Sequence, residues 1–112
     1  MCIFCKKAFD IIDENDYVYT IYDGFPVTNG HSLIIPKRHV ESFFDLNQLE
    51  YQAVLNAIHQ QKKRLDERYN PDGYNIGVNV FEAAGQTVHH VHIHLIPRYN
   101  GDTKNPRGGV RG

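Results

Sequence analysis

The chain has 112 residues, a formal net charge of −1, 41% hydrophobic residues and 22% charged residues. This length is typical of a single domain, and the composition excludes a disordered, collagen-like or coiled-coil chain. The 12 Lys and Arg residues nearly balance the 13 Asp and Glu residues, which gives no support for an extended nucleic-acid or anionic-membrane surface. No apolar run approaches the roughly 20 residues that span a bilayer, and the first residues do not resemble a secretory signal. We therefore expect a cytoplasmic protein with no membrane or nucleic-acid partner.

Two strands joined by a turn are predicted in the first third of the chain. Residues 17–23 are rich in β-branched and aromatic side chains and end at a Gly-Phe-Pro turn. Residues 31–35 follow an Asn-Gly pair and stop at Pro36. The two segments are expected to form a hairpin.

A long amphipathic helix is predicted next. Asp45 is the expected N-cap, the helix begins at Leu46, and Gln48 reaches back toward the cap. The helix runs to about Arg68, before a Pro-Asp-Gly turn. Its apolar stripe recurs at steps of three and four residues and consists of Leu46, Leu49, Ala53, Ala57, Ile58 and Leu65.

Two further strands and a tail complete the pattern. Residues 74–80 and 88–96 alternate apolar with polar or small side chains, and a small-residue loop separates them. From about residue 99 to residue 112 the sequence has no periodicity and is expected to be irregular. The order of elements predicts an α+β fold in which an antiparallel sheet carries one long helix on a face, with residues 1–112 forming one domain.

Histidine is the unusual feature of the composition, because four of the seven lie between residues 89 and 94. In an extended strand His90, His92 and His94 share one face, and the apolar residues between them share the other. The three imidazoles are spaced about 7 Å apart, so the strand alone can offer a pair, but not a compact triple, to one metal ion.

The neighbours of these histidines favour phosphate chemistry. Gly85, Gln86 and Thr87 bring close backbone approach, an amide donor and a hydroxyl donor to the start of the strand. A neutral imidazole can attack phosphorus through one nitrogen when an acceptor holds the N–H of the other. The alternatives are a solvated polar strand face or a metal-storage tract.

Two blocks of the sequence resemble a known family. The run His90-Val-His-Ile-His-Leu-Ile96 is similar to the signature of the histidine triad (HIT) proteins, and residues 84–98 around it are similar to the Fhit-like and bacterial HIT branches. Residues 30–39, Gly-His-Ser-Leu-Ile-Ile-Pro-Lys-Arg-His, match a second block of that family. The resemblance implies a HIT-like fold, a homodimer, and hydrolysis at the α-phosphate of nucleoside 5′-phosphate derivatives such as dinucleoside polyphosphates, through a nucleotidyl-histidine intermediate.

The resemblance also implies roles for individual residues. The middle histidine, His92, is the implied nucleophile. The other implied catalytic residues are the triad histidine His90 and the phosphate-site histidines His94 and His31. Asp23 is the implied ribose ligand, and Asn79 is the implied contact to the α-phosphate. Gln86 and Thr87 are implied to contact the phosphate or the leaving group. For Asp23 a plain turn residue at a strand end is the alternative.

The two cysteines form a single Cys-x-x-Cys motif, which is too small a set to crosslink a secreted mini-domain. From the residues alone, Cys2 and Cys5 are a redox pair, half of a metal site or two inert thiols. The resemblance implies that they join His39 and His90 in a structural zinc site, whose loss should loosen the N-terminus before it affects phosphate chemistry. A divalent cation can also accompany a polyphosphate substrate.

Three other functions remain open. The tryptophan-containing tail of the phosphoramidase (Hint-like) branch is missing, which favours a polyphosphate substrate over a phosphoramidate. A nucleotide-binding interaction module with little turnover would keep the same fold. A metal-dependent oxygenase would need a carboxylate near the His-x-His pair, and Glu82 is the nearest in sequence.

Overall fold

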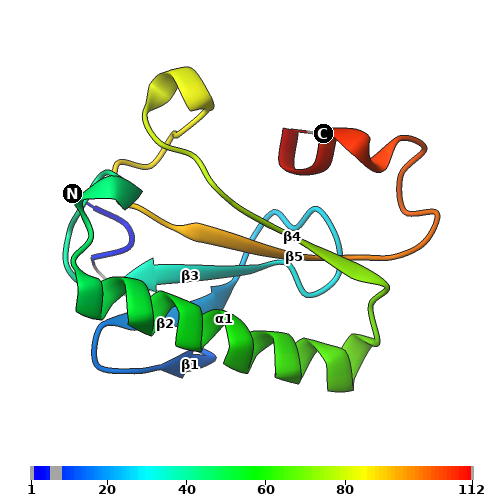
Figure 1. Ribbon diagram of the computed structural model, residues 1–112, viewed down its shortest axis with the longest axis horizontal. Helices are drawn as coiled ribbons and strands as arrows, with labels where there is room; N and C mark the ends of the chain where they lie inside the picture. The colour runs from blue at the N-terminus through cyan, green and yellow to red at the C-terminus, as the bar shows by residue number, and fades with distance from the viewer. Residues whose placement is uncertain (1, 6–8, 112) are drawn as a thin grey trace.

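The computed structural model describes residues 2–5 and 9–111 and shows a five-stranded antiparallel sheet with one long helix (Figure 1). The sheet order is β1-β2-β3-β5-β4, and the predicted fold class is confirmed. The strands and the helix are β1 Asp13–Glu14, β2 Val18–Tyr22, β3 Ser32–Pro36, α1 Gln48–Tyr69, β4 Gly73–Val78 and β5 Ile93–Arg98. Three short 3₁₀ helices cover Phe43–Asp45, Glu82–Ala84 and Pro106–Arg111.

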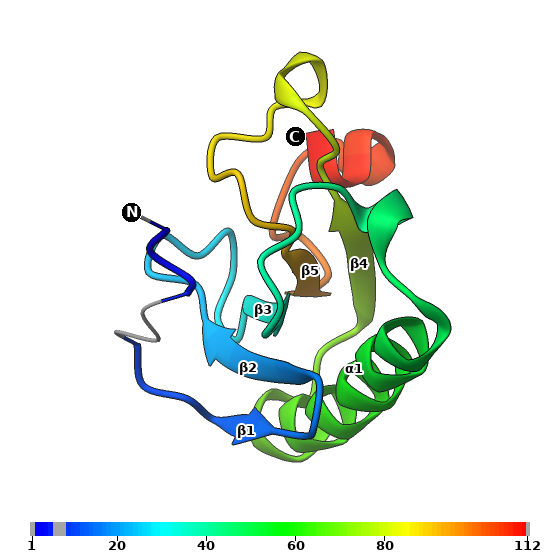
Figure 2. The ribbon, with the colours of Figure 1, turned by 90° about the vertical axis from the view of Figure 1, so that its left-hand side faces the viewer.

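Helix α1 covers one face of the sheet, as both ribbon views show (Figures 1 and 2). Its buried side chains Val54, Ala57 and Leu65 pack against the inward residues of the strands, among them Ile34 and Leu95. Because side chains alternate along a strand, this packing directs the other side chains of β3 and β5 to the opposite face. That opposite face carries the histidines.

The start of α1 differs from the prediction. The N-cap is Asn47, whose side chain accepts from the backbone N–H of Glu50, while the Glu50 carboxylate accepts from the backbone N–H of Asn47. This capping box satisfies two helix-terminal donors, an arrangement worth about 1 kcal/mol for a good cap. Asp45 instead ends the preceding 3₁₀ helix. Leu49, in the first turn, is 60% exposed and does not belong to the core stripe.

The N-terminal segment covers part of the face opposite α1. Phe4 and the outward residues of β2 and β3 form a second buried cluster, which includes Tyr19, Leu33 and Ile35. Figure 2 shows this segment lying beside β2 and β3, away from α1. The first residues of the chain are thereby placed next to the histidine-bearing strand.

The last predicted strand begins later than expected. Residues 88–92 lie outside the sheet, because the N–H of Val91 donates to the carbonyl of Val40 in the loop before α1 and not to a strand. Strand β5 then extends through Pro97 to Arg98, paired with β4 along its full length. Only His94 of the three alternating histidines therefore lies within β5.

The segment after β5 is ordered by local contacts. Asp102 accepts two hydrogen bonds from the guanidinium of Arg98, which holds the pKa of its carboxyl at about 2. The 3₁₀ helix Pro106–Arg111 follows and lies against β4. The stretch predicted to be irregular thus contains this 3₁₀ helix after a run of turns, and residue 112 lies outside the described residues. Within residues 2–5 and 9–111, no helix combines the length and hydropathy needed to cross a bilayer.

Candidate functional site

A backbone carbonyl two residues earlier holds His92 in one tautomer. Its Nδ1 lies 2.9 Å from the carbonyl oxygen of His90, so Nδ1 carries the proton and donates it. The ring is only partly buried, and its Nε2 is left with a free lone pair. This is the protonation state that a nucleophilic imidazole requires.

His31, just before β3, and His94 in β5 form a hydrogen-bonded pair. The backbone N–H of Val27 donates to Nδ1 of His31, so the proton of the neutral ring is on Nε2. That Nε2 donates to Nδ1 of His94 at 2.9 Å and lies 3.4 Å from a carboxylate oxygen of Asp23. His94 must then carry its own proton on Nε2. The pair therefore presents an N–H donor on the open face of the sheet.

Burial keeps the rings of His31 and His94 neutral. It lowers the pKa of His94 to about 4, with smaller contributions from His92 and His31. It also lowers the pKa of His31, against an opposing contribution from Asp23. The ring planes of His92 and His94 cross at 63° with centroids 5.2 Å apart, so the predicted nucleophile and the predicted phosphate donor are neighbours.

A small cavity of about 110 Å³ opens beside this pair. It brings together three of the predicted site residues, one just before β3, one just after β4 and one in β5. Its lining consists of Val27, His31, Gly77, Asn79, His94 and Ile96. Gly85 lies near it, since a Cβ built on that residue would be 3.9 Å from Nδ2 of Asn79. The cavity offers amide and imidazole donors.

Of the four predicted substrate contacts, only Asn79 lines this cavity. Asp23 lies beside it, 3.4 Å from His31, whereas Gln86 and Thr87 are used elsewhere. The Gln86 amide is buried and fully used: its oxygen accepts from the N–H of Phe81, and its nitrogen donates to the carbonyls of Glu41 and Val88. Thr87 is exposed and lines a separate cavity beside Cys2 and His39. The physical reason is that Gln86 holds the 81–88 loop folded onto the segment before α1.

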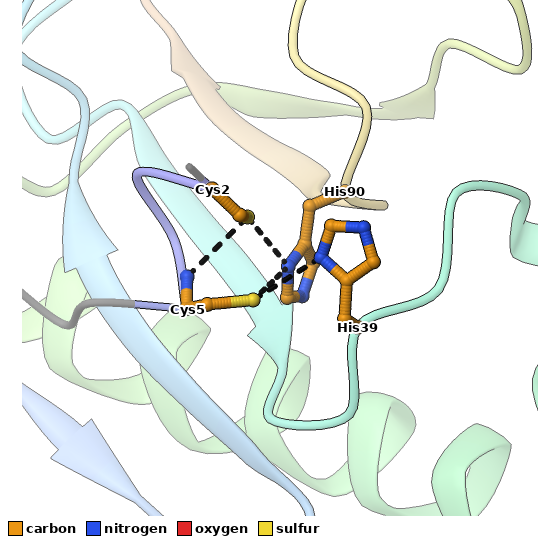
Figure 3. Close-up of side chains that lie close together, drawn as sticks. All are labelled: Cys2, Cys5, His39 and His90. Carbon is orange, nitrogen blue, oxygen red and sulfur yellow. Dashed lines mark hydrogen bonds between the residues drawn. The ribbon is translucent and has the colours of Figure 1, made fainter.

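Cys2, Cys5, His39 and His90 come together at the N-terminal end of the site (Figure 3). The Sγ of Cys2 lies 3.2 Å from Nδ1 of His90, and the Sγ of Cys5 lies 3.1 Å from Nδ1 of His39. His90 is fully buried, and its Nε2 donates to the carbonyl of Pro36. Its side chain thus belongs to this cluster and is fully buried, whereas the rings of His92 and His94 are only partly buried.

The donor set fits a zinc ion. Two thiolates and two imidazole nitrogens are preferred zinc ligands, and the four atoms lie within 4.8 Å of one another, so they face one common point. Because Nε2 of His90 donates to a carbonyl, its Nδ1 is free to coordinate, and that hydrogen bond fixes the ring as an outer-shell partner would. With all four positions taken by protein, no position is open for substrate.

One contact at the site has no counterpart in the sequence prediction. The ring of Phe4, between the two cysteines, lies with its centroid 5.1 Å from that of His92. Its position inside the Cys-x-x-Cys motif is the only sequence signal that could have indicated it. The neighbouring supports, the Val27 N–H and the Pro36 carbonyl, are backbone groups and leave no mark in the sequence.

The fold and the site define a small α+β domain with paired histidines at a small polar cavity. A family model described as the HIT domain matches residues 6–101. The chain therefore belongs to the HIT family, whose members are nucleotide-binding proteins that include hydrolases and transferases.

Individual relatives agree with this assignment. An uncharacterized HIT-like protein from Methanocaldococcus jannaschii is 39% identical over 109 residues, which cover 91% of this chain and 82% of the relative. The AP-4-A phosphorylase of Mycobacterium tuberculosis is 33% identical over 94 residues, 82% of this chain but only 48% of that protein.

Solved structures give the same result. A HIT family protein from Bacillus anthracis superposes with a TM-score of 0.85 at 36% identity, covering 90% of this chain and 75% of that one. A zinc-bound histidine triad family protein from Mycobacterium smegmatis superposes with a TM-score of 0.83 at 33% identity, covering 93% of this chain and 79% of that one.

Proposed function

We propose that the protein hydrolyses nucleoside 5′-phosphate derivatives at the α-phosphorus, with His92 as the nucleophile. The observation that carries the proposal is the bond from Nδ1 of His92 to the carbonyl of His90, because it leaves an unprotonated Nε2 toward the open face. The cavity beside His31 and His94 supports it, since a phosphate there would meet N–H donors next to that nitrogen.

The reaction has two steps. Nε2 of His92 attacks the α-phosphorus, a P–N bond forms, and the P–O bond to the leaving group breaks. The imidazolium charge that develops is stabilised by the hydrogen bond from Nδ1 to the His90 carbonyl. Water then attacks the same phosphorus, the P–N bond breaks, and the nucleoside monophosphate leaves. The N–H on Nε2 of His94 is placed to donate to the phosphoryl oxygens in both steps.

The nucleoside is proposed to lie toward Asp23. Two carboxylate oxygens can accept from both ribose hydroxyls, and Asp23 is near the phosphate cavity through its 3.4 Å approach to His31. Asn79 lines that cavity and is proposed to contact the α-phosphate. Gln86 and Thr87 would reach a leaving group only after the 81–88 loop moves, so we assign Gln86 the role of fixing that loop.

The leaving group is proposed to be a polyphosphate of the dinucleoside type, and a phosphoramidate is the alternative. The name of the mycobacterial relative supports the first choice and adds a variant, in which inorganic phosphate replaces water as the acceptor. These possibilities share one intermediate and differ only in what leaves and what attacks second.

One incubation separates these outcomes. The purified chain is given diadenosine tetraphosphate or adenosine 5′-phosphoramidate in ¹⁸O-labelled water, with and without inorganic phosphate, and the products are resolved by mass. We expect AMP carrying one ¹⁸O atom and, from the tetraphosphate, unlabelled ATP. ADP that forms only when phosphate is added would assign the phosphorylase variant. Label in ATP would contradict attack at the α-phosphorus, and binding without turnover would assign the binding-module alternative.

The four-residue cluster is proposed to hold a structural zinc ion. The zinc-bound mycobacterial neighbour and the donor geometry support this. The cytoplasm is the compartment we propose for the protein, because its reducing conditions keep both thiols available as ligands.

We also propose a homodimer formed through the β4 edge of the sheet. Among the described residues, β4 pairs with β5 alone, so its outer edge has unpaired backbone groups. Exposed apolar side chains lie on it and just after it: Ile76 at 57% and Phe81 at 53% exposure. Sedimentation equilibrium should give twice the mass of the chain, and Ile76→Lys should give the monomer. A monomeric wild type at micromolar concentration would refute this interface.

A further inference from the structure

Phe4 connects the Cys-x-x-Cys motif to the predicted nucleophile. Its ring is only 5% exposed and lies 5.1 Å from the ring of His92 at an interplanar angle of 55°. It also meets the ring of His90 edge-on, at 5.9 Å and 86°. One aromatic side chain thus contacts both a proposed metal ligand and the proposed nucleophile.

Phe4 has little freedom to move. The hydroxyl of Tyr19 donates to its carbonyl oxygen, and Tyr19 is itself buried in β2. The ring of Phe9 packs against it at 5.8 Å. On either side along the chain are Cys2 and Cys5, whose sulfur atoms contact His90 and His39. The position of the ring is therefore set by the thiol cluster and by the sheet.

A second connection runs through the backbone of His90. Its side chain is fixed at both nitrogens, Nδ1 by the cysteine sulfurs and Nε2 by the carbonyl of Pro36. The carbonyl of the same residue accepts the Nδ1–H of His92. Both supports of the nucleophile, the ring contact and the tautomer-fixing hydrogen bond, thus start from the four-residue cluster.

We infer that this cluster positions the nucleophile as well as stabilising the fold, and that Phe4 is a positioning residue for His92. The inference rests on the proposed role of His92. Loss of the Phe4 ring would leave the imidazole free to turn about its side-chain torsions, and release of His90 would remove the acceptor that selects the reactive tautomer. A displacement of about 1 Å in a reacting group can cost about a hundredfold in rate.

A purely structural role for Phe4 predicts a different result. Phe4 also belongs to the buried cluster with Leu33 and Ile35, so its truncation will destabilise the chain in either case. If packing were its only role, the molecules that remain folded would react at the wild-type rate. Stability alone therefore cannot test the inference, and kcat of the folded protein can.

The first experiment compares Phe4→Ala and Phe4→Leu with Ile3→Ala, a control at the adjacent position, which is 47% exposed. All are assayed at a temperature where circular dichroism shows them folded. We expect Phe4→Ala to lower kcat about ten- to a hundredfold with KM within about twofold, Phe4→Leu to recover part of the loss, and Ile3→Ala to match the wild type. If Phe4→Ala does not fold, Phe4→Leu carries the test. Wild-type kcat in the folded Phe4 variants would overturn the inference.

The second experiment does not depend on turnover. Ring ¹⁵N spectra of the zinc-loaded chain, recorded where His92 is neutral, should show a single Nδ1–H tautomer for His92. Removal of the metal by a chelator from the still folded protein, and separately Phe4→Ala, should each produce a mixture with the Nε2–H tautomer. An unchanged single tautomer after both treatments would refute the coupling. A wild type that turns over no nucleotide would refute the proposed function while leaving this readout intact.

Discussion

Replacing Gly30 with Ala should destabilise the protein strongly, because this glycine meets two separate requirements. Its φ is +92°, a conformation that costs an L side chain about 1–2 kcal/mol. A Cβ there would lie 2.9 Å from Cδ2 of Leu65 and 3.1 Å from side-chain atoms of Pro97 and Tyr69. Leu65 is completely buried and cannot swing aside, so overpacking adds about 1–3 kcal/mol. The expected loss in the free energy of unfolding is about 2–5 kcal/mol.

The matched control is Gly24→Ala in the same β2–β3 loop. A Cβ on Gly24 would meet no atom within 4 Å, and its φ is not positive, so we expect no loss or a gain of about 0.4–1 kcal/mol. Urea denaturation at a fixed protein concentration measures the free energy of unfolding of both variants. In a thermal scan, the melting temperature of Gly30→Ala should fall by roughly 8–20 °C. A Gly30→Ala variant within about 1 kcal/mol of the wild type would refute the packing argument.

Three other predictions concern the site. Burial lowers the pKa of His94 from 6.5 to about 4, so on acidification the unfolded chain takes up this proton before the folded chain does. The free energy of unfolding should therefore fall as the pH is lowered from 6.5 to about 4, with His94 contributing up to about 3 kcal/mol. His94→Asn should remove that part of the fall in urea titrations across pH, and identical slopes would contradict it. Cys5→Ser should reduce zinc, measured by elemental analysis, from about one per chain to a small fraction and should lower the melting temperature, whereas full zinc content would exclude Cys5 as a ligand. Asp23→Ala should raise KM about tenfold for adenosine substrates but leave it unchanged for 2′,3′-dideoxyadenosine analogues, and equal effects on both would refute ribose binding.

The helix boundary shows how far local sequence rules reach. The apolar period correctly predicted one long helix, and both Asp45 and Asn47 are good capping residues. The pattern that decides between them, Asn47 with Glu50 three residues later, is present in the sequence, so this boundary was predictable.

The site was predictable where it depends on local periodicity. The side chains of His92 and His94 do lie next to each other, as alternation along an extended segment requires. His90 differs from them in burial, because residues 88–92 lie outside the sheet and its ring is enclosed beside the thiols of the N-terminal segment. Such contacts join residues 85–88 positions apart, and no local rule contains them.

Gln86 shows the same limit. Its residue type suggested a phosphate donor, but the carbonyl of Glu41, 45 positions away, takes one of its bonds and two backbone groups of its own loop take the others. Whether a polar side chain faces the substrate or the fold depends on where unpaired backbone groups lie, which only the folded chain determines.

Trapping the covalent intermediate is the most direct test of the central claim, that His92 is the nucleophile. The protein is mixed with diadenosine tetraphosphate labelled at the α-phosphorus, denatured without acid because P–N bonds to histidine are acid-labile, digested and mapped by mass spectrometry. We expect adenylate on the peptide that contains His92. In His92→Asn the adenylate should be absent, and kcat should fall by about three orders of magnitude or more. Label on another residue, or a His92→Asn variant that keeps a tenth of the wild-type kcat, would contradict it.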